Sequence, residues 1–555
     1  MFFFTAIVFF FATFLISCNS KNKTEQGYVI VKPTMEDEKI QEEITSIFES
    51  VSDNKLTLQN TPINYVAVVK NYYQQTEYVP IWSKENKLSG AALNLVNYLQ
   101  NAALQGLYNA DYNFEKIKKL KNELLNDTLK TIGNRTWANA DILFTDAFVG
   151  LLKDLKQGRL HADSLSWKFD TSKHNKYFGA NIEKIKYTNN IDSLLESVQP
   201  KHEDYINLKK GIKRFVDSMD NHTYTYVNYP YKDTLAFNKI LRKRLTEAGI
   251  KFDAADDSLA MSNAIKTYQH KIGLTADGKI GATLVKRLNI NDKQRFNIIA
   301  ITLDKYKLLP DKMPPKYIWV NLPTYQLKVF ENDTIVLESK IICGKAATPT
   351  PLLTSAITDI VLYPTWTVPN SIITKDMLPG LKRNTNYLAR RGLYLLNGKG
   401  QKINASSINW NKYTKGIPYR IQQGSGNSNA LGIIKFNFDN EYSVYLHDTN
   451  QRYLFKNSVR CLSHGCVRVQ EWQKLADYII RNDSVNLKKG DSLKVNTDSI
   501  KNWMLTKINR KVNVNNKIPL YIRYFACELV NDKIKFFDDI YEEDKNLKQK
   551  YFANK

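Results

Sequence analysis

The chain reads Arg460-Cys461-Leu462-Ser463-His464-Gly465-Cys466-Val467-Arg468-Val469, and shortly before this it reads Tyr445-Leu446-His447-Asp448-Thr449. Nineteen positions (466 minus 447) separate His447 from Cys466. A thiol with an ordinary pKa of about 8.5 is only a few per cent ionised at neutral pH, so a nucleophilic cysteine needs a base or cationic neighbours. The pattern therefore predicts that Cys466 is a nucleophile and His447 its base.

Strand geometry supports this pairing. In a strand over residues 442–446, Tyr442, Val444 and Leu446 share one face, and the opposite face leads to His447 at the strand end. The imidazole needs an acceptor to orient it, and either a backbone carbonyl near Asp448 or the Asp448 carboxylate serves. Gly465 has no β-carbon and permits a sharp turn. We expect the N–H groups of Gly465 and Cys466 to face an oxyanion, an interaction worth about 3 kcal/mol per donor in other enzymes.

Around these motifs the sequence alternates with the period of strands. Apolar residues alternate over residues 316–342 around an Asn332-Asp333 turn, which predicts a hairpin. Further strands are expected at residues 357–363, 432–438 and 442–446, and residues 517–540 are expected to return to the same sheet. Residues 370–423 are too long for a plain loop and predict a lid or inserted subdomain. The predicted β domain covers residues 316–545.

The first half of the chain has a helical period instead. One apolar stripe recurs at three- and four-residue spacing, which is typical of an amphipathic helix. The stripe consists of Ala140, Leu143, Phe144, Ala147, Phe148, Leu151, Leu152 and Leu155. We expect a helical domain over residues 37–230 and a separate three-helix unit over residues 233–290. The fold class is therefore α+β.

Composition fits a large globular chain with an acidic partner. The 555 residues predict three to four folded units. Lys and Arg exceed Asp and Glu by 24 (79 minus 55). This excess suits nucleic acid, an anionic membrane or an anionic polymer such as cell wall, although a Lys- and Asn-rich background composition explains it as well.

The N-terminus predicts export. Residues 1–16 are apolar except for one Thr, which is short for a bilayer span but fits the core of a secretion signal. Leu15-Ile16-Ser17-Cys18 resembles a bacterial lipobox, which implies lipidation of Cys18 after removal of a signal segment, with residues 19–36 as a tether. An uncut membrane anchor is the alternative. Either interpretation exports the rest of the chain, where an oxidising compartment normally pairs cysteines.

Together these motifs resemble a known family. The SHGCVRV motif with an upstream HDT resembles the catalytic motif of the YkuD-type L,D-transpeptidases. The segments VNLPTYQLKVF, YPTWTVPNSI, NALGIIKF and YLHDT match the larger, scaffold-bearing periplasmic members in order. The resemblance implies an α-helical N-terminal scaffold, a mainly antiparallel β catalytic domain, and a capping subdomain at residues 370–423. Residues 233–290 resemble the small three-helix peptidoglycan-binding domain.

The resemblance also implies a chemistry. Cys466 attacks a tetrapeptide stem, D-Ala leaves, and the thioester passes to the amine of a second stem to form a 3-3 cross-link, with His447 acting as base and then acid. No metal or organic cofactor is implied. The expected partners are peptidoglycan stem peptides and, through the lipid, a membrane, so the expected location is the periplasm. Carbapenem-type inhibitors are expected to acylate Cys466.

Further residues are placed on the acyl pocket by the resemblance: Ser463, His464, Arg468, Trp366 and Asn429. A structural ion pair is an equal interpretation of Arg468, and a packed, hydrogen-bonded side chain an equal one of His464. Cys461 departs from the family pattern, where a small apolar residue is usual. We expect it to fill the core, and an inactivating disulfide with Cys466 is the alternative.

Other functions remain to be distinguished. A non-catalytic, lipid-tethered wall-binding protein needs no reactive thiol. A zinc site of His447, His464 and Cys466 has competent ligands but lacks an HExxH motif. Nucleic-acid binding explains the charge but not the signal segment. A carboxypeptidase or hydrolase shares the acyl-enzyme and differs only in using water as acceptor.

Overall fold

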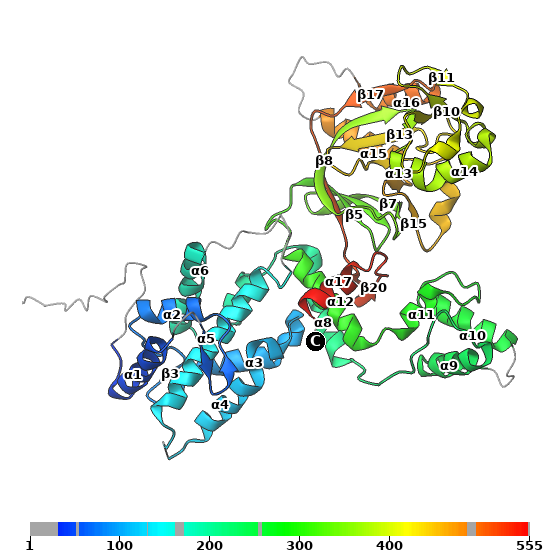
Figure 1. The fold of residues 1–555 in the computed structure, drawn as a ribbon. Coiled ribbons are helices and arrows are strands. Elements are labelled where there is room, and N and C mark those ends of the chain that lie inside the picture. Colours follow the sequence, from blue (N-terminus) through cyan, green and yellow to red (C-terminus); the bar gives the residue numbers. More distant parts are fainter. Residues whose placement is uncertain are drawn as a thin grey trace, which may run out of the picture. The chain divides into compact units, whose positions relative to one another are not determined.

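The computed structural model describes residues 32–51, 55–129, 131–160, 171–252, 258–484 and 495–552. The predicted signal segment (1–18), its Cys18 and most of the tether lie outside these residues. Contacts divide the chain into two compact units, Met1–Pro200 and Lys201–Lys555, and Figure 1 traces both from blue to red. Within the described residues no helix is both long enough and apolar enough to cross a bilayer.

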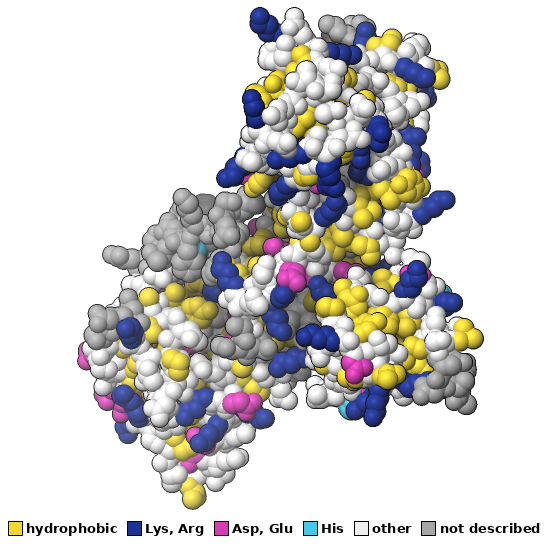
Figure 2. All heavy atoms as spheres, turned by 45° about the vertical axis from the view of Figure 1, so that its right-hand side comes forward, with side chains coloured by type: hydrophobic (Ala, Val, Ile, Leu, Met, Phe, Trp, Pro, Cys, Tyr) yellow, Lys and Arg dark blue, Asp and Glu magenta, His cyan; other side chains and the backbone are white. Residues whose placement is uncertain are grey.

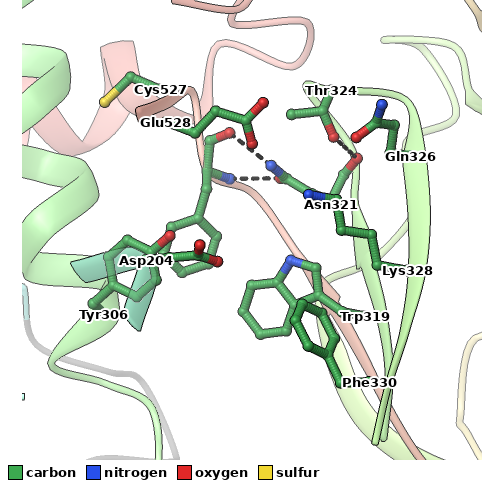
Figure 3. A pocket seen from close by; sticks show the side chains of 11 residues that line it. Asp204, Tyr306, Trp319, Asn321, Thr324, Gln326, Lys328, Phe330, Cys527 and Glu528 are labelled. Carbon is green, nitrogen blue, oxygen red and sulfur yellow. Dashed lines mark hydrogen bonds between the residues drawn. The ribbon is translucent and has the colours of Figure 1, made fainter. Parts of the chain in front are cut away.

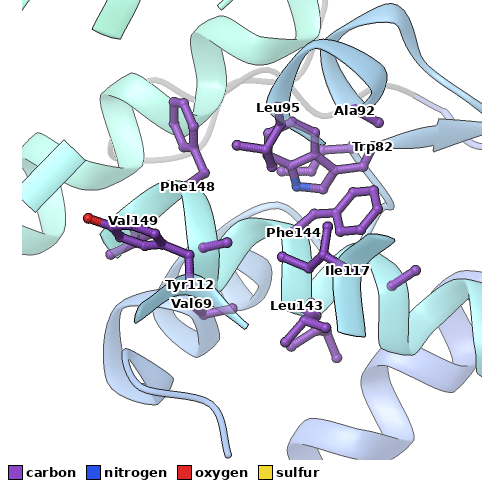
Figure 4. Close-up of a cluster of buried hydrophobic side chains, with 14 of the residues drawn as sticks. Val69, Trp82, Ala92, Leu95, Tyr112, Ile117, Leu143, Phe144, Phe148 and Val149 are labelled. Carbon is purple, nitrogen blue, oxygen red and sulfur yellow. The ribbon is translucent and has the colours of Figure 1, made fainter. Parts of the chain in front are cut away.

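The first unit is helical with two small hairpins. Its helices are α1 (Met35–Glu49), α2 (Val66–Gln75), α3 (Gly90–Gln100), α4 (Phe114–Asn126), α5 (Asn134–Lys156), α6 (Thr171–Glu183) and α7 (Asp192–Ser197), and its hairpins are β1 (Thr57–Leu58) with β2 (Thr61–Pro62) and β3 (Ser83–Lys84) with β4 (Lys87–Leu88). All eight residues of the predicted apolar stripe on α5 are buried in one core, as expected. The helix is not amphipathic, however, because every residue from Trp137 to Leu152 is buried, so α5 is surrounded by protein on all faces. In Figure 4, Phe144 and Phe148 of α5 lie against Trp82.

The second unit begins with helices. These are α8 (Glu203–Asp217), α9 (Thr234–Glu247), α10 (Ser258–Lys271), α11 (Ala282–Asn289) and α12 (Asp292–Tyr306). Helices α9, α10 and α11 enclose a small core of their own, as expected of a three-helix unit. Helix α8 packs on β19 (Cys527–Val530) and β20 (Lys533–Phe536). The contact boundary therefore falls at residue 200, ahead of the predicted end of the scaffold at residue 230.

The β domain is one large mixed sheet. Its strands are β5 (Lys316–Asn321), β6 (Gln326–Glu331), β7 (Thr334–Gly344), β8 (Leu353–Leu362), β13 (Ile434–Phe438), β14 (Leu446–His447), β15 (Cys461–Ser463), β16 (Val467–Val469), β17 (Arg510–Asn513) and β18 (Pro519–Arg523). Most neighbours are antiparallel, and the pairs β14–β16, β7–β15 and β5–β18 are parallel. Strand β13 pairs with both β14 and β8, so the sheet closes on itself.

The inserted segment forms its own layer. Strands β9 (Trp366–Thr367), β10 (Leu393–Leu396), β11 (Lys402–Ile403) and β12 (Arg420–Gln423) form a four-stranded sheet, accompanied by α13 (Asn370–Ile372), the π-helix η4 (Ile373–Met377) and α14 (Leu378–Arg383). A separate apolar core holds the insert together. The C-terminal part contains α15 (Trp472–Ser484), α16 (Thr497–Leu505) and α17 (Glu543–Tyr551).

Two strand predictions needed correction. Strand β18 returns to the main sheet as expected, but β19 and β20 form a separate hairpin. The strand expected at residues 442–446 begins only at Leu446. The Asn440 side chain accepts hydrogen bonds from the backbone N–H groups of Tyr442 and Val444, and Ser443 has a φ of 56°, so this segment turns instead of extending.

Candidate active site

Two short parallel strands place the predicted nucleophile and base. Leu446 of β14 pairs with Val467 of β16, and His447 pairs with Arg468. Paired residues of neighbouring strands point to the same face, and successive residues alternate. Leu446 and Val467 are buried in the core of the β domain, so His447 and Arg468 point to the opposite face, where Cys466 and Tyr445 continue the two strands.

The residues on this opposite face line one cavity. It has a volume of about 630 Å³ and is lined by Cys466, His447 and Arg468 of the sheet and by Trp366, Asp376 and Met377 of the insert, among others. The structure thus brings together Cys466, His447, Ser463, His464, Arg468 and Trp366 of the predicted site residues.

The turn that presents Cys466 is held by buried hydrogen bonds. The Ser463 hydroxyl donates to the Cys466 carbonyl at 2.6 Å and accepts from the Gly465 N–H at 3.2 Å. The Thr350 hydroxyl donates to the Gly465 carbonyl at 2.7 Å. Gly465 has a φ of 116°, a conformation that side chains other than glycine rarely adopt. Conformation, not lack of space, explains the glycine, because an added β-carbon would meet its nearest neighbour only at 3.6 Å.

Burial sets the resting charges of the pair. Burial lowers the pKa of His447 to about 3, with Arg468 adding to the effect, while the polar backbone at Asp448 and Leu431 opposes it. Burial raises the pKa of the Cys466 thiol, while hydrogen bonds from the backbone and side chain of Tyr445 lower it. Both groups are therefore neutral at rest, and a neutral base in the same cavity as an un-ionised thiol suits general-base activation.

Two cations and a tyrosine complete the surroundings of the thiol. Lys435 of β13 pairs with His447, and its ammonium group lies 4.0 Å from the centroid of the Tyr445 ring. Lys435 and Arg468 both lower the pKa of Cys466. The sequence pattern had placed Tyr445 on the face of His447 without assigning it a role. Lys435 was missed, since its position depends on the register between β13 and β14.

Arg468 lines the cavity, and one of its N–H donors has no partner within the described ranges. Its Nη1 donates to the Gln451 side chain at 3.1 Å. Its Nε is buried and has no hydrogen-bond partner among the described residues. An ion pair, the structural alternative considered for Arg468, is not found in the described part of the chain. An unpaired buried donor beside a cavity suits an acceptor on a ligand.

His464 connects the catalytic turn to the insert. Its Nε2 lies 2.6 Å from the Asp376 carboxylate on η4. Both side chains are partly exposed, at 34% and 46%. Asp376 could not be predicted from the sequence, because it lies on an insert whose docking depends on tertiary structure.

Asn429 and Asp448 serve the framework behind the cavity. Asn429 is fully buried, donates to the carbonyls of Pro364 and Gly424, and accepts from the Leu431 N–H. The Asp448 carboxylate pairs with Arg452 and accepts from the Ile433 N–H at 3.1 Å. Neither acceptor expected to orient His447 is found bonded to its ring: the Asp448 carboxylate pairs with Arg452, and His447 Nδ1 is buried without a hydrogen-bond partner among the described residues.

The cysteines other than Cys466 are structural in their placement. Cys343, Cys461, Cys466 and Cys527 are all free thiols. Cys461 stands opposite Cys343 in the β15–β7 pairing and packs against the core. In the described part of the chain no three His, Cys, Asp or Glu side chains gather in a way that suits a metal ion, and the zinc ligands considered above form no such group.

Comparison with known families matches two parts of the chain. Residues 315–487 match the L,D-transpeptidase catalytic domain of the YkuD family, and residues 67–212 match the scaffold domain. The matched region at residues 315–487 is therefore an L,D-transpeptidase catalytic domain. More particularly, the chain combines a scaffold domain with a YkuD-type catalytic domain, the family to which the motifs at His447 and Cys466 were similar.

Individual proteins are similar to parts of this chain. A curated protein from Haemophilus influenzae, provisionally named an L,D-transpeptidase, is 30% identical over 263 residues, which cover 47% of this chain and 50% of the relative. The chain thus matches about half the length of that relative. Solved structures with similarity include an L,D-transpeptidase from Mycobacterium smegmatis (11% identity, 38% of this chain, 58% of that chain, TM-score 0.18). Another is the catalytic domain of the E. faecium enzyme acylated by ertapenem (13% identity, 38% and 99%, TM-score 0.18).

Proposed function

We propose that this chain is a peptidoglycan L,D-transpeptidase that forms 3-3 cross-links through a thioester on Cys466. The observation that carries the proposal is the parallel pairing of β14 and β16, which turns Cys466 and His447 to one face and into one cavity. The family match at residues 315–487 supports the reaction class.

The first half-reaction forms the acyl-enzyme. The Cys466 sulfur attacks the carbonyl carbon of the bond between the diamino acid and the terminal D-Ala, and the thiol proton passes to His447. The N–H of Cys466 stabilises the oxyanion, joined by the N–H of Gly465 when it exchanges its 3.2 Å bond to Ser463 for the substrate. The C–N bond then breaks, and His447 returns its proton to the departing amine.

The second half-reaction transfers the acyl group. The side-chain amine of a second stem attacks the thioester, a new amide bond forms, the C–S bond breaks, and His447 carries the amine proton to the sulfur. The free Cys466 thiol is thereby restored. The cavity of about 630 Å³ is lined by residues of the insert as well as of the sheet and has room for a peptide.

Product analysis tests this function. Full-length protein is incubated with a tetrapeptide stem, and the peptides are identified by mass spectrometry. The proposal expects release of D-Ala and a cross-linked dimer, both lost in Cys466→Ala. Trimmed tripeptide without dimer would instead identify a carboxypeptidase. A Cys466→Ala variant that fully replaces the wild type in cells would identify a non-catalytic wall-binding protein.

Inhibition follows from the same sulfur. A carbapenem presents a strained carbonyl that resembles the scissile one, so we expect it to acylate Cys466. Intact-mass spectra of the full chain should gain the mass of one carbapenem, and Cys466→Ala should gain none. An adduct on Cys461 or Cys343 instead would contradict the assignment of the nucleophile.

The cell-wall location is likewise proposed. The chain carries a net charge of +24, and Figure 2 shows Lys and Arg side chains spread over the face that it displays. Such a surface suits an anionic wall, and the three-helix unit α9–α11 is its proposed binding module. Cys18 is the proposed site of a lipid anchor in the periplasm. Metabolic labelling with a fatty acid should mark the wild type and leave Cys18→Ala unlabelled.

A further inference from the structure

A second cavity in the Lys201–Lys555 unit shares no residue with the catalytic one. It lies where the start of α8, the end of α12 and strands β5 and β6 meet, and it has a volume of about 280 Å³. A narrower recess adjoins it and shares Asp204, Tyr306, Trp319 and Phe330. Figure 3 shows the recess, with these four side chains on one side and Glu528 on another.

Aromatic rings form the walls. The rings of Tyr317 and Phe330 stack at 4.7 Å with an interplanar angle of 8°. Phe525 packs between Tyr306 at 4.5 Å and Trp319 at 5.4 Å. No hydrogen bond of the Trp319 indole N–H is found among the described residues. These contacts hold the rings in place, and all five rings line the cavity or the recess.

Two carboxylates in the recess have no partner. Neither Asp204 nor Glu528 makes a side-chain hydrogen bond or ion pair within the described ranges. Desolvation raises the pKa of both carboxyl groups, and the charge of Asp204 raises the pKa of Glu528 further. Lys328 opposes both shifts, but its ammonium group is shared with Glu338 at 3.8 Å.

The charge of this region is opposite to that of the chain. Five acidic residues line the cavity and recess (Glu203, Asp204, Asp311, Asp333 and Glu528) against three lysines (Lys201, Lys312 and Lys328). Elsewhere in the sequence basic residues predominate, with an excess of 24 overall. A local acidic, aromatic recess on a basic protein attracts a cation rather than the anionic polymer.

Ring faces together with carboxylates are the chemistry that recognises an organic ammonium group. An ammonium ion over an aromatic face gains about 0.5–2 kcal/mol, depending on its desolvation, and charged hydrogen bonds to carboxylates add to this. The cavity volume suits an aminoalkyl chain. We propose that this recess is a non-catalytic binding site for a primary ammonium group, supplied by the free side-chain amine of the diamino acid in an uncross-linked stem peptide. The identity of that source rests on the proposed function.

Binding to simple probes tests the site directly. Titration calorimetry on the full-length protein uses Nα-acetyl-lysine amide and, as control, the same compound acetylated on its side-chain nitrogen. We expect the amine to bind at least tenfold more tightly than the acetylated compound. Asp204→Asn combined with Glu528→Gln should weaken amine binding at least tenfold. Asp498→Asn, a change at an exposed carboxylate of α16, should leave it unchanged.

A substitution of the aromatic wall gives an independent measurement. Trp319→Ala should weaken amine binding about tenfold, and Trp319→Phe should restore part of it, because a ring face remains. Equal binding of the two probes, or amine binding that survives both the double carboxylate variant and Trp319→Ala, would overturn the proposal.

Two further measurements separate this inference from the proposed function. A stem tripeptide with a free side-chain amine should bind wild type better than its acetylated form. If lysine amide binds at the recess and the tripeptide does not, the stem assignment is wrong. Carbapenem acylation of Cys466 is measured in the same variants and should stay at the wild-type rate. Failed acylation with intact amine binding would refute the function alone, and intact acylation without amine binding would refute the recess alone.

Discussion

Cys466 and His447 should both be neutral in the resting enzyme. Burial lowers the pKa of His447 from 6.5 to about 3, so at about 1.4 kcal/mol per unit its protonation costs about 5 kcal/mol more than that of a free imidazole. Burial also raises the pKa of the Cys466 thiol. Both shifts oppose proton transfer from the thiol to the imidazole. The thiolate fraction at neutral pH should therefore be small.

Alkylation of the thiol measures this fraction. The full chain is treated with iodoacetamide across a range of pH, and the Cys466 peptide is quantified by mass spectrometry. The rate should rise about tenfold per pH unit between about pH 5 and pH 8, because thiolate alone reacts. His447→Gln should change the rate at neutral pH less than about threefold. The same variant should slow carbapenem acylation at least about a hundredfold, because general-base help is needed there.

A different pH profile would refute this reasoning. Alkylation that is constant between about pH 5 and pH 8 would show a preformed thiolate–imidazolium pair. Loss of ultraviolet thiolate absorbance in His447→Gln would lead to the same conclusion. The Cys461 peptide, read from the same samples, provides an internal control for unfolding.

Four further perturbations follow from the structure. Ser463→Ala removes the hydroxyl that donates to the Cys466 carbonyl and should cost about 1–3 kcal/mol in urea unfolding. Because the turn then presents Cys466 less firmly, acylation should slow about tenfold or more, whereas Ser463→Thr keeps the hydroxyl. An alanine variant with wild-type stability and rate would contradict the bracing role. Asp376→Asn weakens a partly exposed contact with His464, so the free energy of unfolding should change by less than about 1 kcal/mol. Amide hydrogen exchange of residues 370–423 should become faster. Unchanged exchange would argue against this contact holding the insert. Gly432 has a φ of 64°, and a β-carbon added there would lie 2.2 Å from the Asp448 carboxylate. Gly432→Ala should therefore lower the free energy of unfolding by about 2–5 kcal/mol. Unchanged stability in urea unfolding would be inconsistent with this crowding. Burial lowers the pKa of His447 from 6.5 to about 3, so the unfolded state takes up the proton first as pH falls. The contribution of His447 to the free energy of unfolding is therefore complete above about pH 6.5 and declines by about 1.4 kcal/mol per pH unit down to about pH 3. Stability measured against pH should have a shallower slope in His447→Gln, and an identical slope would be evidence against a neutral buried imidazole.

Local patterns in the sequence predicted a large part of this structure. The apolar positions of α5 and the alternation in β6 were read correctly as buried positions, which a single segment encodes, although α5 is buried on its polar faces as well. The same rule put His447 and Tyr445 on the face opposite Leu446, and the pairing of β14 with β16 agrees with it. The motif around Cys466 was informative because its glycine, with a φ of 116°, has a backbone conformation that few other residues adopt.

Features that depend on contacts between segments far apart in the sequence could not be predicted. The place of Lys435 beside Tyr445 follows from the register of β13 on β14. The Asp376–His464 contact requires the insert to be docked on the sheet. The early end of the segment before Leu446 depends on the Asn440 side chain, whose hydrogen bonds compete with strand formation. In each case the deciding partner is a side chain or strand that local periodicity does not identify.

We propose that Cys466 alone carries the acyl group, and trapping the acyl-enzyme is the most direct test. Full-length protein turning over a tetrapeptide stem is quenched in acid, and its mass and peptide map are recorded. We expect one adduct with the mass of the tripeptide acyl group, attached to Cys466 and released by an added thiol or amine. An adduct on any other residue, or turnover that persists in Cys466→Ala, would contradict it.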